Sequence, residues 1–256
     1  MGLFDKKYCD VCGEKIGLLG NRKLEDGNLC KDCARKLSPW FSERRNSSVN
    51  EIKRQLEYRE ENRGRVEAFH ITRTLGSGTK LLLDEDAGLF MVTSAKNIAE
   101  ANPDVLALSD VTGCTLDVEE SSKELLREDK DGNEVSYNPP RYEYSYDFYI
   151  IVNVNNPYFN EMRFRINPNS VEISPPPSIR PGVTLRFNPE TNAEYKKYKQ
   201  LGEEIRQILV KVRDDAREKI EQAAAPKTAV SCPYCGATTT PDASGCCEYC
   251  GGALMG

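Results

Sequence analysis

The chain is poor in the residues that most enzymes and membrane proteins depend on. Its 256 residues include a single histidine, His70. Histidine is the usual general acid or base near neutral pH, so one copy leaves little room for chemistry of that kind. The longest uninterrupted apolar run is residues 148–152, whereas a membrane-spanning helix needs roughly 20 apolar residues. We therefore expect neither a histidine-based enzyme nor a transmembrane segment.

An excess of basic charge is also missing. The chain has 35 Lys and Arg against 40 Asp and Glu, a net charge of −5. Phosphate contacts dominate nucleic-acid affinity, and no basic stripe supplies them, so we do not expect nucleic-acid binding. The N-terminal residues contain no apolar core long enough for a signal peptide. With 39% hydrophobic and 29% charged residues, the composition is that of an ordinary soluble protein, which we expect in the cytoplasm.

Cysteine, by contrast, is abundant and clustered. Eight of the ten cysteines form four C-x-x-C pairs, two near each end of the chain. The pairs are Cys9/Cys12, Cys30/Cys33, Cys232/Cys235 and Cys247/Cys250. A disulfide framework normally accompanies secretion, which we do not expect. The spacing therefore predicts two separate metal modules around a cysteine-poor middle.

Zinc is the metal that such pairs indicate, because it prefers tetrahedral thiolate coordination and a C-x-x-C turn offers two sulfurs at once. Glycine follows the second cysteine in three pairs, at Gly13, Gly236 and Gly251, where positive φ lets backbone N–H groups turn toward the sulfurs. Four thiolates leave no open position on the metal. We therefore predict two structural zinc ions, with iron–sulfur binding as the alternative.

The two modules are expected to differ in form. Cys33 runs into Ala34-Arg35-Lys36 without a glycine, which indicates a helix start and a treble-clef finger at the N-terminus. The C-terminal pairs are both turns, as in a zinc ribbon. Cys246 precedes Cys247 directly; choosing Cys247 as the ligand preserves the spacing and leaves Cys246 as a spare thiol.

The middle of the chain has the pattern of short strands. Residues 42–63 are highly charged and predict a linker with a short exposed helix. Strict alternation of apolar residues over 142–154 predicts a half-buried strand. Further strands are predicted at 80–84, 88–93, 104–108, 111–118, 162–166 and 171–174, the first two forming a hairpin. The prolines at 175–177 and 181 predict an extended connection, and 119–141 a mobile loop or small hairpin.

A long amphipathic helix closes this region. Asn188 is a candidate N-cap, Pro189 the first helical residue, and apolar residues recur at steps of three and four to about residue 220. Strands and a helix together predict an α+β fold, a small antiparallel barrel or sheet capped by its helix. The expected domains are a zinc domain at 1–41, the linker at 42–63, the strand domain at 64–225 with its helix at 189–225, and a zinc ribbon at 226–256.

Both ends resemble known bacterial modules. The segment CDVCGEKIGLLGNRKLEDGNLCKDCARKLSP resembles a small N-terminal zinc domain of unknown function found mainly in Gram-positive bacteria, and CPYCGATTTPDASGCCEYCGGAL resembles double-zinc-ribbon-like tails. Through its strand series, its LALSDVTGCTLDVE segment and its closing helix, the middle is similar to bacterial pleckstrin-homology-like domains. The resemblance implies a bacterial protein, and none of these families implies a defined reaction.

The remaining candidate residues point away from catalysis. His70 lies in an apparent strand, Cys114 has no base beside it, and residues 75–80 lack the spacing of a phosphate loop. Asp129, Asp131 and Gly132 do not complete a calcium loop and indicate a turn. We expect a non-enzymatic zinc-binding adaptor for an unknown protein partner. The alternatives are a zinc-dependent nucleic-acid-associated regulator, or a peripheral binder of membrane surfaces through the strand domain.

Overall fold

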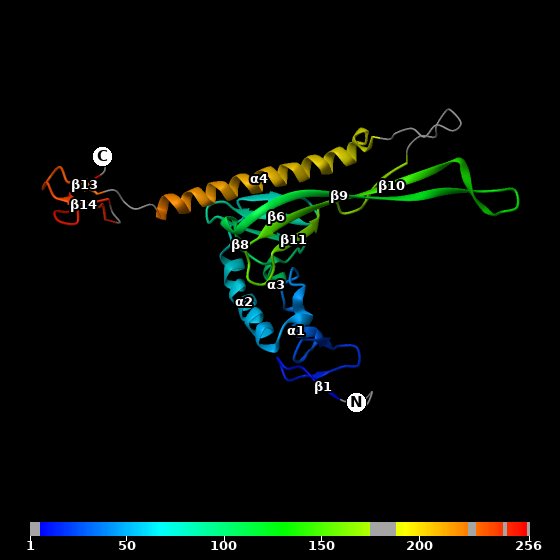
Figure 1. The fold of residues 1–256 in the computed structure, drawn as a ribbon, viewed down its shortest axis with the longest axis horizontal. Helices are drawn as coiled ribbons and strands as arrows, with labels where there is room; N and C mark the ends of the chain where they lie inside the picture. Colours follow the sequence, from blue (N-terminus) through cyan, green and yellow to red (C-terminus); the bar gives the residue numbers. More distant parts are fainter. Residues whose placement is uncertain (1–5, 175–187, 225–228, 243–244, 255–256) are drawn as a thin grey trace. The chain divides into compact units, whose positions relative to one another are not determined.

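The computed structural model describes residues 6–174, 188–224, 229–242 and 245–254 (Figure 1). The chain divides into two compact units, Met1–Asp214 and Asp215–Gly256. The extended connection predicted at 175–177 and 181 lies outside the described residues. None of the described helices is long and apolar enough to cross a membrane.

The first unit begins with two small hairpins and a short helix. The elements are β1 (Lys7–Tyr8), β2 (Lys15–Ile16), β3 (Arg22–Lys23), β4 (Asn28–Leu29) and α1 (Lys31–Arg35). They enclose a small core made of three cysteines and five aliphatic side chains: Cys9, Ile16, Leu24, Leu29, Cys30, Cys33, Leu37 and Ile52. So few apolar residues bury little surface, which is why a domain of this size commonly needs a metal.

Helix α2 (Val49–Ala68) differs from the short exposed helix predicted in the linker. It is 20 residues long, follows a 3₁₀ turn at Glu43–Asn46, and starts with a capping box between Ser48 and Glu51. One face is buried through its whole length, at Ile52, Gln55, Arg59, Asn62 and Val66. Three of these five are polar, so the hydrophobic pattern alone shows only a thin stripe. The helix is an integral part of the unit.

The first sheet holds four antiparallel strands in sequential order. They are β5 (Arg73–Leu75), β6 (Lys80–Asp84), β7 (Leu89–Thr93) and β8 (Leu106–Ala107), with α3 (Ile98–Ala101) between the last two. The predicted hairpin is confirmed, since β6 and β7 pair from Lys80↔Thr93 to Asp84↔Leu89. Leu82 and Met91 face Val66 of α2 in a shared cluster, which joins this sheet to the helix.

The second sheet is organised around one long strand, β10 (Glu134–Val154). It pairs with β9 (Val111–Glu128) on one edge, and with β11 (Glu161–Arg165) and β12 (Val171–Ile173) on the other. The predicted alternation over 142–154 is confirmed from Tyr146 to Val154, where every second residue is buried, whereas Tyr142 is 40% exposed. A 3₁₀ turn at Leu108–Asp110 leads into β9.

Residues 119–141 form a hairpin, as one of the two predicted alternatives had it, but a long one rather than a small one at the sheet edge. They are the outer part of the β9–β10 ribbon, which stays paired out to Glu134↔Glu128 and is visible in Figure 1 as a long green arm. The register shifts between Ser136 and Arg141, where two prolines cannot donate to the ladder. The predicted hairpin is therefore present but continues the two central strands over a much greater length, which the charged and proline residues of this segment did not indicate.

The described strands form two separate sheets and three two-stranded hairpins, and they do not close into a barrel. Of the predicted forms, the sheet is therefore observed and the barrel is not. The fold is a mixed helix-and-sheet arrangement. The pleckstrin-homology-like resemblance of the middle stays a prediction.

Helix α4 (Ala193–Ala224) packs on the second sheet through its N-terminal part. A 3₁₀ turn occupies Pro189–Thr191, and the Asn192 side chain caps the helix by accepting from the backbone of Glu194 and Tyr195, so α4 begins later than predicted. The Tyr195 ring lies 5.1 Å from the Phe148 ring. Buried α4 residues are Tyr195, Tyr198, Ile205 and Leu209.

The second unit contains the end of α4 and a small hairpin module. Strands β13 (Val230–Ser231) and β14 (Thr238–Thr239) pair antiparallel. An isolated bridge joins Cys246 to Ala253. These short pairings surround Cys232 and Cys247, the two most buried side chains of the module.

Candidate metal centres

Three of the four C-x-x-C pairs adopt the same turn. In the first, the Gly13 N–H donates to the Cys9 carbonyl over 2.8 Å, and the Cys9 N–H donates to the Glu14 carbonyl over 2.9 Å. The turns at Cys232 and Cys247 repeat this pattern. Gly13, Gly236 and Gly251 have φ between 70° and 77°, the left-handed region that favours glycine. The glycine positions predicted from the sequence are confirmed.

The fourth pair sits at the start of α1. Cys30 is the N-cap, and its sulfur accepts from the Cys33 N–H over 3.3 Å. Cys33 lies in the first turn, so both sulfurs face the turn that holds Cys9 and Cys12. The predicted order of turn, hairpin and helix is present, and the positive end of the short helix points its N–H groups at sulfur.

The structure brings the eight predicted cysteines into two groups. Cys9, Cys12, Cys30 and Cys33 form one, and Cys232, Cys235, Cys247 and Cys250 the other; within each group all sulfurs lie within 4.8 Å of one another. Sγ–Sγ distances are 3.7 Å for Cys12–Cys30, 3.5 Å for Cys232–Cys250 and 3.7 Å for Cys235–Cys247. Each group can hold one metal ion.

These distances suit a single tetrahedral ion. Zn–S bonds of about 2.3 Å place the sulfurs of a tetrahedron about 3.8 Å apart. A disulfide would need about 2.05 Å, and all ten cysteines are free thiols. A four-iron cluster binds each thiolate to a different iron and so spreads the sulfurs more widely. The geometry is consistent with zinc in both groups.

In each group, backbone N–H groups stabilise the thiolate form of one cysteine. Burial raises the pKa of Cys9, but N–H groups of Cys12, Cys30 and Val11 outweigh it and bring the pKa to about 7. Burial likewise opposes ionisation of Cys232, whereas N–H groups of Cys235 and Tyr234 lower its pKa to about 6.

The neighbouring thiols oppose one another's ionisation. Burial, followed by contact with the thiols of Cys30 and Cys12, strongly raises the pKa of Cys33. The Gly252 N–H lowers the pKa of Cys250, but the thiols of Cys235 and Cys232 raise it to about 12. A divalent ion removes this repulsion, so the donor set fits a thiophilic dication.

The adjacent cysteines of the C-terminal module occupy different environments. Cys247 is 1% exposed and belongs to the four-sulfur group. Cys246 lies outside that group; its backbone N–H donates to the Asp242 carboxylate over 2.9 Å. The placement follows the predicted choice of Cys247 over Cys246.

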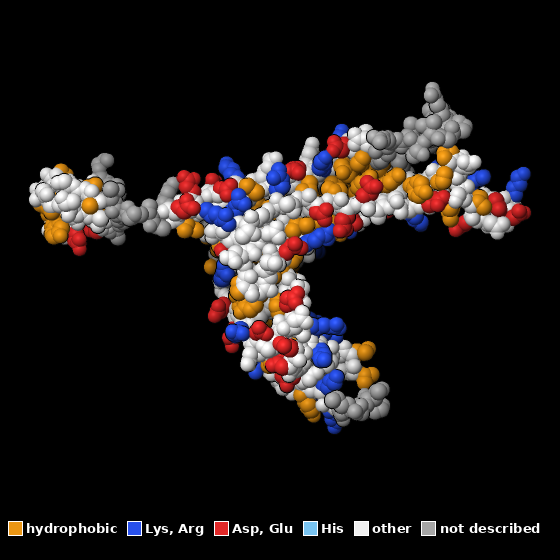
Figure 2. All heavy atoms as spheres, viewed as in Figure 1, with side chains coloured by type: hydrophobic (Ala, Val, Ile, Leu, Met, Phe, Trp, Pro, Cys, Tyr) orange, Lys and Arg blue, Asp and Glu red, His pale blue; other side chains and the backbone are white. Residues whose placement is uncertain are grey.

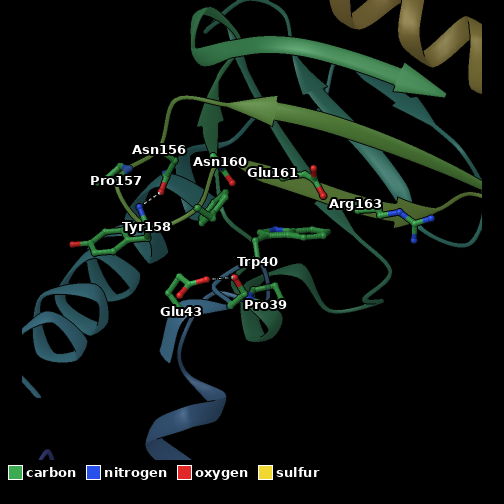
Figure 3. A pocket seen from close by; sticks show the side chains of 11 residues that line it. Pro39, Trp40, Glu43, Asn156, Pro157, Tyr158, Asn160, Glu161 and Arg163 are labelled. Carbon is green, nitrogen blue, oxygen red and sulfur yellow. Dashed lines mark hydrogen bonds between the residues drawn. The ribbon is translucent and has the colours of Figure 1, made fainter. Parts of the chain in front are cut away.

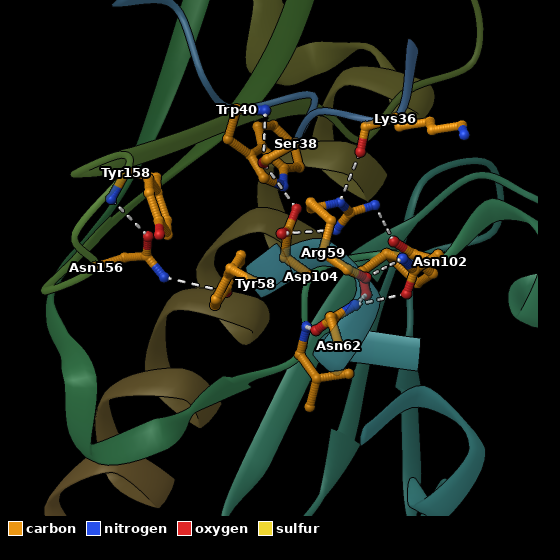
Figure 4. A network of polar contacts seen from close by, with 12 residues as sticks. Lys36, Ser38, Trp40, Tyr58, Arg59, Asn62, Asn102, Asp104, Asn156 and Tyr158 are labelled. Carbon is orange, nitrogen blue, oxygen red and sulfur yellow. Dashed lines mark hydrogen bonds and ion pairs between the residues drawn. The ribbon is translucent and has the colours of Figure 1, made fainter. Parts of the chain in front are cut away.

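A buried polar network links the first cysteine group to the strand domain (Figure 4). The guanidinium of Arg59 on α2 pairs with Asp104 at 2.7 Å, and its Nε donates to the Lys36 carbonyl just after α1. Ser38 donates to the other Asp104 oxygen over 2.8 Å. Burial raises the pKa of Asp104, and the Arg59 guanidinium acts in the opposite direction. This carboxylate therefore depends on its partners to stay charged.

Two asparagines complete the network. Asn62 donates to the Asn102 side chain and to the Pro103 carbonyl, and accepts from the Val105 N–H over 2.9 Å. Asn102 has φ of 47° and donates to the Arg59 carbonyl. Sequence reasoning missed these residues. The available signal was the step of three and four that places Gln55, Arg59 and Asn62 on one helical face with Ile52 and Val66.

A cleft of about 690 Å³ lies between the chain after α1 and the loop before β11 (Figure 3). Trp40 occupies its centre, with Tyr158 on one side and Arg163 on the other. The indole Nε1 of Trp40 is buried and has no hydrogen-bond partner among the described residues. Glu43 and Glu161 line the cleft together with Arg163, so acidic side chains outnumber basic ones in its lining.

The other candidate residues lie apart from the cysteine groups. The His70 side chain is 78% exposed. Cys114 is buried in β9, and burial raises its pKa to about 11, so its thiol is protonated at neutral pH. Gly76 has φ of 88° and makes a tight turn between β5 and β6. Asp129 caps the β9–β10 turn by accepting from the N–H groups of Asp131 and Asn133, as predicted for a turn.

The N-terminal part of the chain contains a recognisable domain. Residues 7–55 match a family described as a domain of unknown function, DUF4428. The match contains the first four-cysteine group and ends within α2, which continues to Ala68. No curated protein and no solved structure matches the chain.

Proposed function

We propose that the protein is a bacterial, non-enzymatic adaptor that holds two structural zinc ions and docks other proteins. The observation that carries the proposal is the pair of four-sulfur groups. A zinc ion with four thiolates has no open position for water or substrate, so it stabilises a fold and activates nothing. In this proposal the first module is a treble-clef finger and the second a zinc ribbon.

The cleft beside Trp40 supports the docking role. Its volume lies in the range of ligand-binding clefts, and its aromatic and acidic lining suits a peptide with a basic side chain. Trp40 and Tyr158 are residue types enriched at interaction hot spots. The protonated state of Cys114 and the exposure of His70 support the absence of a catalytic centre.

Elemental analysis of protein purified without added metal tests the metal assignment, and we expect a zinc-to-chain ratio near two. A ratio near one would mean that one of the two groups binds no zinc. Abundant iron with visible absorbance would mean that the bound metal is iron. For docking, we expect the full chain to retain a defined protein from its host, and Trp40→Ala to retain much less. Cys246→Ser serves as the matched control. Equal retention by all three proteins would contradict docking at this cleft.

A further inference from the structure

The turn between β2 and β3 displays two adjacent leucines to solvent. Leu18 is 92% exposed and Leu19 is 87% exposed. Among the described residues, the next most exposed large aliphatic residue is Ile220, at 55%. Isolated exposed leucines are ordinary, but a fully exposed neighbouring pair is a concentrated apolar surface.

The fold holds this pair outward. Ile16 before the turn and Leu24 after it are 7% and 1% exposed, so both ends of the segment are anchored in the small core. The Gly20 N–H closes the turn on the Gly17 carbonyl over 3.0 Å, and Arg22 donates to the Leu19 carbonyl. With its flanks buried and its backbone bonded, the turn presents the leucines as a defined tip.

The base of the tip is basic. Lys7 pairs in register with Ile16, the residue before the turn, and Lys15 precedes Ile16 on β2, opposite Tyr8; both lysines are exposed. Within residues 6–23 the acidic side chains are Asp10 and Glu14. Both belong to the Cys9 turn, which joins β1 and β2 beyond the Tyr8–Lys15 pair, so Lys7 is the lysine nearer the leucine turn. Figure 2 shows apolar side chains projecting beside Lys and Arg in this region.

We propose that this turn inserts Leu18 and Leu19 into the surface of an anionic lipid bilayer, with the lysines at its base contacting the headgroups. An apolar tip above basic side chains is the composition that binds at such interfaces. The net charge of −5 does not prevent this, because charges beyond about 8 Å are largely screened at physiological ionic strength. Neither leucine belongs to the metal groups, so the inference goes beyond the adaptor role.

Sedimentation of the zinc-loaded full chain with vesicles tests the proposal. Vesicles of equal amounts of phosphatidylserine and phosphatidylcholine should bind the protein, and phosphatidylcholine alone should bind it much less. The L18S/L19S variant should lose about tenfold or more in affinity, because two apolar side chains no longer leave water. The matched control, L126S/I220S, removes two exposed aliphatic residues elsewhere and should bind like the parent.

A charge variant tests the contribution of the lysines separately from that of the leucines. K7Q/K15Q should weaken binding severalfold, and added salt should weaken the parent more than this variant. Zinc content near that of the parent shows that each variant is folded. Absence of binding to anionic vesicles, equal binding to neutral ones, or undiminished binding by L18S/L19S would overturn the proposal. A dimer or a protein complex that depends on these leucines, without vesicle binding, would also overturn it.

Discussion

Asp104 illustrates how one buried carboxylate can hold two parts of a chain together. Its oxygens accept from Ser38, which follows α1, and from Arg59, which lies midway along α2. The Asp104 side chain is fully buried and that of Arg59 is 7% exposed. A buried ion pair is costly to form, but losing one partner leaves the other charge without compensation.

Replacing Asp104 by alanine should therefore destabilise the first unit by about 3–5 kcal/mol, because Arg59 stays buried and unpaired. Urea unfolding of the zinc-loaded protein measures this change. Glu60→Ala removes an exposed ion pair with Arg63. The Glu60 side chain is 76% exposed and the Arg63 side chain 47%. It should cost less than about 1 kcal/mol. Equal costs for the two variants would show that Asp104 does not hold the unit together.

The adjacent cysteines at the C-terminus provide a second test at the residue scale. Cys247→Ser should release one zinc ion, because its sulfur belongs to the four-sulfur group. Cys246→Ser should retain two zinc ions per chain. Zinc content after gel filtration distinguishes the variants. Equal loss from both would mean that the module exchanges ligands between neighbouring sulfurs.

At the scale of elements, the glycines inside the two long helices differ in their surroundings. Gly64 lies in the C-terminal part of α2 on the exposed face, and a Cβ added there would meet no atom within 4 Å. Gly202 of α4 is different, since a Cβ there would lie 2.5 Å from Leu116 Cδ1. Packing therefore does not require a glycine at position 64, whereas the missing Cβ of Gly202 allows α4 to approach the sheet closely.

Gly64→Ala should accordingly stabilise the protein by about 0.5–1 kcal/mol, because alanine loses less backbone entropy in a helix. Gly202→Ala should gain less or lose stability, since Leu116 must move. Urea unfolding curves of the two variants make the comparison. A gain at Gly202 as large as that at Gly64 would mean that the α4 contact with Leu116 yields without cost.

At the scale of the whole molecule, the two metal modules are connected to the rest in different ways. The first shares a core with α2 through Ile52 and reaches the strand domain through Lys36 and Ser38. The second belongs to a separate compact unit. Loss of metal should therefore have wider consequences at the N-terminus than at the C-terminus.

Cys9→Ser should lower the zinc content from two ions to one and leave the C-terminal module loaded. Small zinc domains usually unfold without their ion, so amide hydrogen exchange should increase in residues 6–46 and also along α2 and around Asp104. Cys232→Ser should raise exchange only in the second unit. Loss of both ions from either change would contradict separate sites.

The sequence alone determined which cysteines form the two candidate metal groups, because the cysteines of a C-x-x-C turn are neighbours in the chain. Spacing, glycine placement and the helix start at Cys30 identified the two groups that the structure assembles. The same holds for the β6–β7 hairpin, the alternation along β10 and the long closing helix, whose patterns are local.

The role of polar residues was decided only by the tertiary structure. Arg59 and Asp104 are buried because they pair with each other, and Asn62 because it bonds to residues 102, 103 and 105. No local pattern reveals such distant partners. The β9–β10 arm is held by backbone pairing that tolerates charged side chains. Local periodicity indicates which apolar residues are buried. Burial of polar groups and pairing of charged strands depend instead on contacts that form only when the chain folds.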